Sequence, residues 1–132
     1  MGGIIGPYGG LIWQYFPEAR DEVIEMIARE LRCARDDERQ PEDIPVFDYT
    51  IYAVLPVIEP LGSVIASNDL VQRFCLFCRA ILVYSGPDAM DVDYNFRVTL
   101  LEYVDIPDVE AVVRVADPEL VDLVRARCGK WK

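Results

Sequence analysis

A helical repeat of apolar side chains is the feature that most restricts the fold of this chain. It is clearest over residues 17–35, PEARDEVIEMIARELRCAR. Apolar residues recur there at helical spacing: Ala19, Val23, Ile24, Ile27, Ala28 and Leu31. This spacing places them on one face of an α-helix and the charged residues on the other. The segment therefore predicts an amphipathic helix that lies on a core.

The following segments continue the helical period. Residues 67–86, 87–105, 107–116 and 117–129 each carry an apolar stripe at helical spacing. In residues 87–105 the stripe consists of Val92, Phe96, Leu100 and Tyr103. Several ends carry capping residues: Ser67 or Asn68, Asp117 before Pro118, and glycines at Gly86 and Gly129. A nucleotide-binding sheet would require strands that alternate with helices, and the sequence shows no such alternation.

Residues 46–67 are apolar nearly all round, which predicts a central element. Their β-branched and aromatic content also suits a strand. We favour a helix because apolar residues keep helical spacing at Phe47, Ile51, Val54, Leu55, Ile58 and Leu61. Pro56 and Pro60 then require a kink or a break.

These segments predict an all-α protein. We expect a single domain over residues 1–132, built as a bundle of about five to six helices in stacked antiparallel hairpins. Residues 1–16 contain five glycines. They predict a glycine-rich flexible segment and not a phosphate loop, because no strand precedes them and no GKS or GKT follows.

Charge restricts the partners. The chain has 23 acidic and 13 basic residues, no histidine and a formal net charge of −10. This charge disfavours binding to nucleic acid or to anionic membranes, and it favours a basic partner. No run reaches the roughly 18 apolar residues of a membrane span, and no secretory signal is recognisable. We therefore expect a cytoplasmic protein with neither nucleic-acid nor membrane partners.

Two cysteines three positions apart, Cys75 and Cys78, are compatible with a metal site, a redox pair or core packing. They lie well inside an expected helix among apolar residues, and a redox pair would sit at a helix N-terminus. Only the single, distant Cys33 and Cys128 could complete a zinc site. We interpret the pair as core residues and expect no metal and no cofactor.

The chain offers little for catalysis. Without histidine, neither a Ser-His-Asp triad nor a Cys-His pair can form, so we expect a protein that is not an enzyme and has no catalytic residues. An enzyme would have to use the Asp88 cluster or Glu102. Glu102 lies in an otherwise apolar stretch, which favours a buried ion pair with Arg97 or Arg114.

The block DLVQRFCLFCRAILVYSG...DVDYNFRVTLLEYVD, within residues 68–105, resembles a bacterial family of small helical proteins of unassigned function. The family pattern is a helix ending in LL-x-SG, an acidic turn and a second helix ending in LLE. The matching positions are Phe74, Ile81, Leu82, Ser85, Gly86, Val98, Leu100, Leu101 and Glu102. Pro87 departs from the acid that usually follows the glycine. Relatives of this family are found among immunity proteins of polymorphic toxin systems.

The resemblance implies an immunity-type protein that binds and neutralises a cognate toxin. A basic, nuclease-like toxin would match the acidic composition. We expect its binding residues in two acidic segments: Asp36, Asp37, Glu38, Glu42 and Asp43, and Asp88, Asp91, Asp93 and Tyr94. The alternative is a regulatory or scaffold module that has no toxin partner and holds a partner helix in a groove along residues 46–65.

Overall fold

The structure is a computed structural model that describes residues 5–62 and 67–131. Within these ranges the chain is all-α and has no strand, which confirms the expected fold class. The described elements form seven continuous helical segments, slightly more than expected. They are α1 (Gly6–Tyr15), η1 with α2 (Pro17–Ala19, Arg20–Asp36), α3 to η3 (Val46–Tyr49, Thr50–Val54, Leu55–Ile58, Glu59–Gly62), α5 (Asn68–Leu82), α6 to α7 (Ala89–Tyr94, Asn95–Leu100, Leu101–Val104), α8 (Pro107–Ala116) and α9 (Pro118–Cys128).

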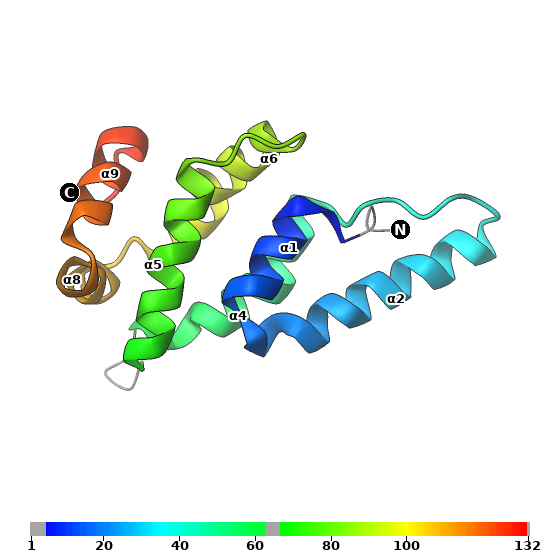
Figure 1. Cartoon of the computed structure of the whole chain (residues 1–132), viewed down its shortest axis with the longest axis horizontal. Helices are drawn as coiled ribbons and strands as arrows, with labels where there is room; N and C mark the ends of the chain where they lie inside the picture. Colours follow the sequence, from blue (N-terminus) through cyan, green and yellow to red (C-terminus); the bar gives the residue numbers. More distant parts are fainter. Residues whose placement is uncertain (1–4, 63–66, 132) are drawn as a thin grey trace.

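Helix α5 lies in the middle of the molecule and contacts α1, α6, α8 and α9. Figure 1 shows α8 and α9 at one end of an elongated body, whereas α2 projects from the other end. The segments from α3 through α5 to α7 run in alternating directions. The side chains of α5 form the centre of one continuous hydrophobic core, to which every helical segment contributes.

The N-terminal segment differs from our expectation of flexibility. Residues 6–15 form helix α1, and its inner side is buried at Tyr8, Gly9 and Ile12. Tyr8, Ile12 and the following Phe16 are four residues apart and all join the core. The apolar stripe therefore outweighs the low helix propensity of glycine. Residues 1–4 of the predicted segment lie outside the described residues.

Helix α2 has the expected position but only part of the expected inner face. Val23 and Met26 are buried, whereas Ile24 and Leu31 are 53% and 40% exposed. The helix projects beyond the body, and Leu31 lies in its projecting C-terminal half (Figure 1). The predicted face was wrong at these two positions.

The segment from α3 to η3 is helical, as predicted, but its register shifts at η2, a π-helical turn. Pro56 lies two positions after the last residue of this turn, and a proline cannot fit a regular α-helical turn because it lacks an N–H and its ring meets the carbonyl four residues earlier. On the N-terminal side of this turn Tyr49 is buried, as is Thr50 at its first position, and Phe47, predicted to face the core, is 52% exposed. Residues 63–66 of the predicted helix lie outside the described residues.

A second π-helical turn, η4, interrupts the segment from α6 to α7. The predicted stripe fails after this turn: Phe96 and Leu100 are buried as expected, but Tyr103 is 46% exposed and Val104 replaces it in the core. Both π turns begin with a buried polar residue. Thr50 Oγ1 donates to Val46 O at 2.9 Å, and Asn95 Nδ2 donates to Asp91 O at 2.9 Å. Such bonds to the carbonyl four residues earlier compete with the regular ladder and bend helices.

Helix α5 matches its predicted inner face. Its buried residues include Phe74, Cys75, Phe77 and Cys78. The hydroxyl of Ser67 caps the helix by accepting a hydrogen bond from the Leu70 amide at 3.1 Å. The helix ends at Leu82, earlier than the predicted glycine cap at Gly86.

The C-terminal helices follow their local signals. Asp117 caps α9 by accepting from the Leu120 amide at 3.2 Å, and Gly129 ends the helix with φ +70°. Trp131 is 1% exposed. Its indole donates to Val104 O at 3.3 Å, so the end of the described chain is fixed to α7.

Candidate functional site

A groove lies between α2 and the chain that returns along it toward α3. Its volume is about 300 Å³. The apolar side of the lining consists of Met26, Cys33, Ile44, Pro45 and Tyr52. The charged side consists of Arg29, Glu30, Glu42, Asp43 and Asp48. The groove lining therefore combines apolar side chains with an excess of carboxylates.

An ion pair holds the two walls of the groove together. Arg39 donates from Nη1 and Nη2 to the two oxygens of Glu30, at 2.6 and 3.1 Å, and the backbone amide of Glu42 donates to the same carboxylate at 2.8 Å. The hydrogen bonds from Arg39 are the main reason why the pKa of Glu30 is lowered to about 2. The loop is therefore fixed along α2, as its path in Figure 1 shows.

The other carboxylates of the groove have no such partner. Glu42 and Asp43 are exposed and Asp48 is half-buried. Within residues 5–62 and 67–131, no salt bridge joins any of the three to a basic side chain. Arg29 is the one basic side chain in the lining, and its nearest acid is Glu25 at 3.8 Å. The groove rim therefore carries a net negative charge.

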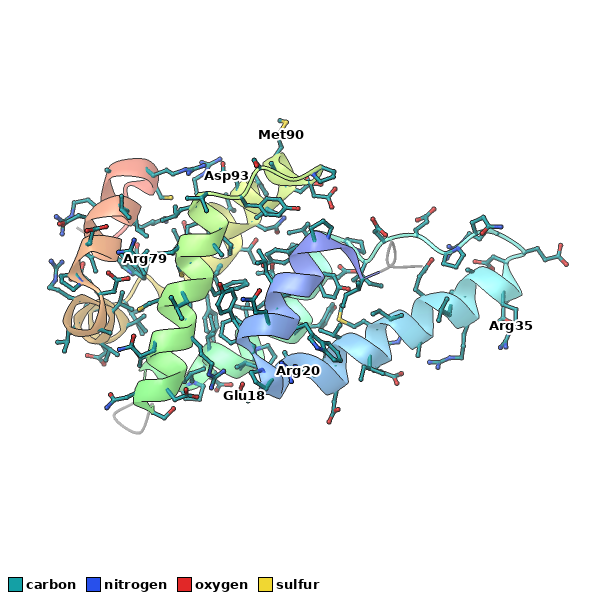
Figure 2. The ribbon with its side chains drawn as sticks, viewed as in Figure 1. Glu18, Arg20, Arg35, Arg79, Met90 and Asp93 are labelled. Atoms are coloured by element: carbon teal, nitrogen blue, oxygen red, sulfur yellow. The ribbon has the colours of Figure 1, made fainter. Side chains whose placement is uncertain are left out.

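The structure does not gather the predicted acidic residues into one surface. Asp36, Asp37 and Glu38 lie at the tip of α2, and only Glu42 and Asp43 of that segment line the groove. The second set lies on α6 or just before it. Figure 2 shows Asp93 far from Arg35, which marks the tip of α2.

The acidic residues of α6 differ in their contacts: one is held in ion pairs within the protein and one is exposed. Asp93 pairs with Arg97 at 3.0 Å and with Arg127 at 3.6 Å. Arg127 also donates to the carbonyl of Leu82, so Asp93 helps to connect η4, α9 and the end of α5. Asp91 and Tyr94 are exposed, Tyr94 by 57%. These two remain available to a partner.

Glu102 has a different partner from those we expected, and it is not buried. Its side chain is 63% exposed and binds Lys130 Nζ at 2.6 Å. This hydrogen bond is the main cause that raises the pKa of Lys130. Arg97 pairs with Asp93, and Arg114 pairs with Glu110 at 3.5 Å. Glu102 therefore connects α7 to the C-terminal segment at the surface.

The thiols of Cys75 and Cys78 lie in the core, as predicted. Burial raises the pKa of Cys75 to about 11 and raises the pKa of Cys78 as well. Cys33 is exposed at the groove. Among the described residues, no three potential metal-ligating side chains lie together. None of the described helices has the length and apolar character to cross a membrane.

Sequence reasoning missed half of the groove. Met26, Glu30 and Cys33 recur at helical spacing on one side of α2, and Asp48 and Tyr52 are four residues apart on the next helical segment. These spacings could have shown that each set shares a face. Nothing in the sequence showed that the two faces meet.

Comparison with protein-family models, with curated proteins and with solved structures finds no match to this chain.

Proposed function

We propose that this chain is an immunity-type protein that binds a basic toxin protein and neutralises it by covering its working surface. The observation that carries the proposal is the preformed, acid-rimmed groove at the projecting end of the molecule. The net charge of −10 supports it, because that charge attracts a basic partner from every side.

Binding fits the chemistry of the chain better than catalysis does. The buried titratable groups are tyrosine and cysteine side chains, and burial raises the pKa of Tyr8 and Cys78 away from neutrality. A group that must exchange protons near pH 7 needs the opposite shift. Two carboxylates of the groove, Glu42 and Asp43, are instead exposed, where they can meet a cationic surface.

Electrostatic attraction sets clear expectations for such a complex. Complementary charge accelerates association, and salt screens this effect beyond about 10 Å at 0.1 M ionic strength. Affinity would come from a few well-packed contacts, for which exposed aromatic residues such as Tyr52 and Tyr94 are suited. The complex should therefore form rapidly at low salt and more slowly as salt is added.

The test is to mix the purified protein with the product of the neighbouring gene. We expect a stable complex by size-exclusion chromatography, an association rate that falls with salt, and loss of the toxin's activity in the mixture. The absence of a complex at low salt would refute the proposal. A regulatory or scaffold module would instead bind a cellular protein unrelated to a toxin, with weak salt dependence.

A further inference from the structure

We propose that the groove between α2 and residues 42–52 is a receptor for one arginine side chain of the partner protein. The inference rests on the proposed function for the partner's basic character, but it can be tested without the partner. It assigns the recognition to one end of the molecule and leaves the acids of α6 outside the binding site.

The size and lining of the groove suit a single long side chain. A volume of about 300 Å³ is at the lower limit for pockets that hold small molecules. Met26, Ile44 and Pro45 provide an apolar surface for the aliphatic part of an arginine. The groove can thus bury the methylene groups of the arginine while its guanidinium group stays near the groove opening.

The rim suits a guanidinium group better than an ammonium group. Asp48 and Tyr52 lie one helical turn apart, and both line the groove. Tyr52 is 58% exposed, so a face of its ring can stack on a planar cation while the Asp48 carboxylate accepts the N–H groups of that cation. Glu42 and Asp43, in the loop before α3, also line the groove and add negative charge.

The groove is held open before a partner arrives. The contacts of Glu30 with Arg39 and with the Glu42 amide fix the loop at distances of 2.6 to 3.1 Å. A preformed site loses little conformational entropy on binding. Arg29 works against a cation in the same groove, although its side chain is 59% exposed and can turn toward solvent. Removing this charge should therefore strengthen the interaction.

The experiment is an NMR titration of the full chain with N-acetyl-Gly-Arg-Gly-amide at low salt. The matched probe contains citrulline, which has the shape of arginine but no charge. We expect the amide resonances of residues 29–33 and 42–52 to shift with arginine, and the citrulline peptide to bind about tenfold more weakly. Equal responses to the two peptides, or shifts centred on residues 88–94, would overturn the assignment.

Variants locate the site. The double variant Glu42→Gln/Asp48→Asn should lose most of the response, and Arg29→Glu should strengthen it by about threefold. The control is Asp91→Asn, which removes an exposed acid from α6 and should bind as the original protein does. Their melting temperatures will show whether the fold is retained. If the double variant responds to the arginine peptide as the original protein does, the groove is excluded as the site, even if the toxin complex forms. If the original protein shows the expected response to the peptide but forms no toxin complex, only the proposed function is refuted.

Discussion

Replacing Gly9 by alanine should destabilise the protein, although alanine is normally the better helix former. Gly9 is buried inside α1. A Cβ atom added there would lie 2.7 Å from Tyr49 Oη and 2.8 Å from Tyr49 Cζ. The ring cannot easily move away, because Tyr49 is 1% exposed and its hydroxyl donates to Ile5 O at 2.8 Å. The added methyl group must therefore displace a core residue.

Two opposing effects set the size of the change. Replacing glycine by alanine within a helix stabilises by roughly 0.5–1 kcal/mol. Inserting a methyl group into a packed core costs typically about 1–3 kcal/mol. The overpacking should win, so we expect Gly9→Ala to lower the free energy of unfolding by about 1–2 kcal/mol. At this chain length, that corresponds to a fall in melting temperature of about 4 °C per kcal/mol.

Gly10 provides the matched control. It lies in the same helix, and no atom lies within 4 Å of a Cβ added there. Gly10→Ala should therefore stabilise the protein by roughly 0.5–1 kcal/mol. Urea unfolding followed by circular dichroism measures both variants, with the m-value as a check that the same surface unfolds. If both substitutions stabilise equally, or neither has an effect, α1 does not pack on Tyr49 and our reasoning about the N-terminal helix is refuted.

Three further predictions follow from individual contacts. In Arg39→Gln, the pKa of Glu30, measured by carboxyl-carbon NMR, should rise from about 2 toward its usual 4.5, and an unchanged pKa would contradict the ion pair as its cause. Because the Glu30 pKa is lowered in the folded state, its contribution to stability is complete above pH 4.5 and is lost as the pH falls toward 2; acid unfolding of Arg39→Gln should therefore show a weaker pH dependence in this window. Cys33 should react with a thiol reagent in the native protein, whereas Cys78 should react only after unfolding, and equal rates would contradict its burial. Trp131→Ala should cost about 3–5 kcal/mol in urea unfolding, because the indole is 1% exposed, and a cost below about 1 kcal/mol would show that the C-terminal segment does not pack on the core.

The sequence was most informative where the structure depends on neighbouring residues. Helix α9 begins and ends where Asp117, Pro118 and Gly129 predict, because capping bonds span only three or four residues. The inner face of α5 was predicted because apolar residues three and four positions apart share one side of a helix. Helix α1 was missed because glycine favours flexibility locally, whereas Gly9 is packed against Tyr49, a contact across forty positions of sequence.

Apolar spacing could predict each helix but not the changes of register within it. A π-helical turn adds a residue and shifts the register between the residues before it and those after it. One regular helical stripe therefore cannot fit both sides of the turn, and Phe47, before η2, and Tyr103, after η4, lie at the surface. Pro56 indicated that the first helix must deform, but a kink, a break and a π turn all satisfy a proline. The second turn has no proline. Its buried Asn95 could be interpreted only once its environment was known.

The groove was the least predictable feature because its two walls are joined by a contact between charged residues, which no sequence period predicts. Its walls meet through Glu30 and Arg39, and sequence alone gives many equivalent pairings among exposed charged residues. The same ambiguity made the two acidic segments look equivalent. In the structure they differ: Asp93 is paired with two arginines, whereas Glu42 and Asp43 face a concave surface. An acid that already holds the fold together loses that contact if it binds a partner, so recognition of a cation should fall to the unpaired acids beside the groove.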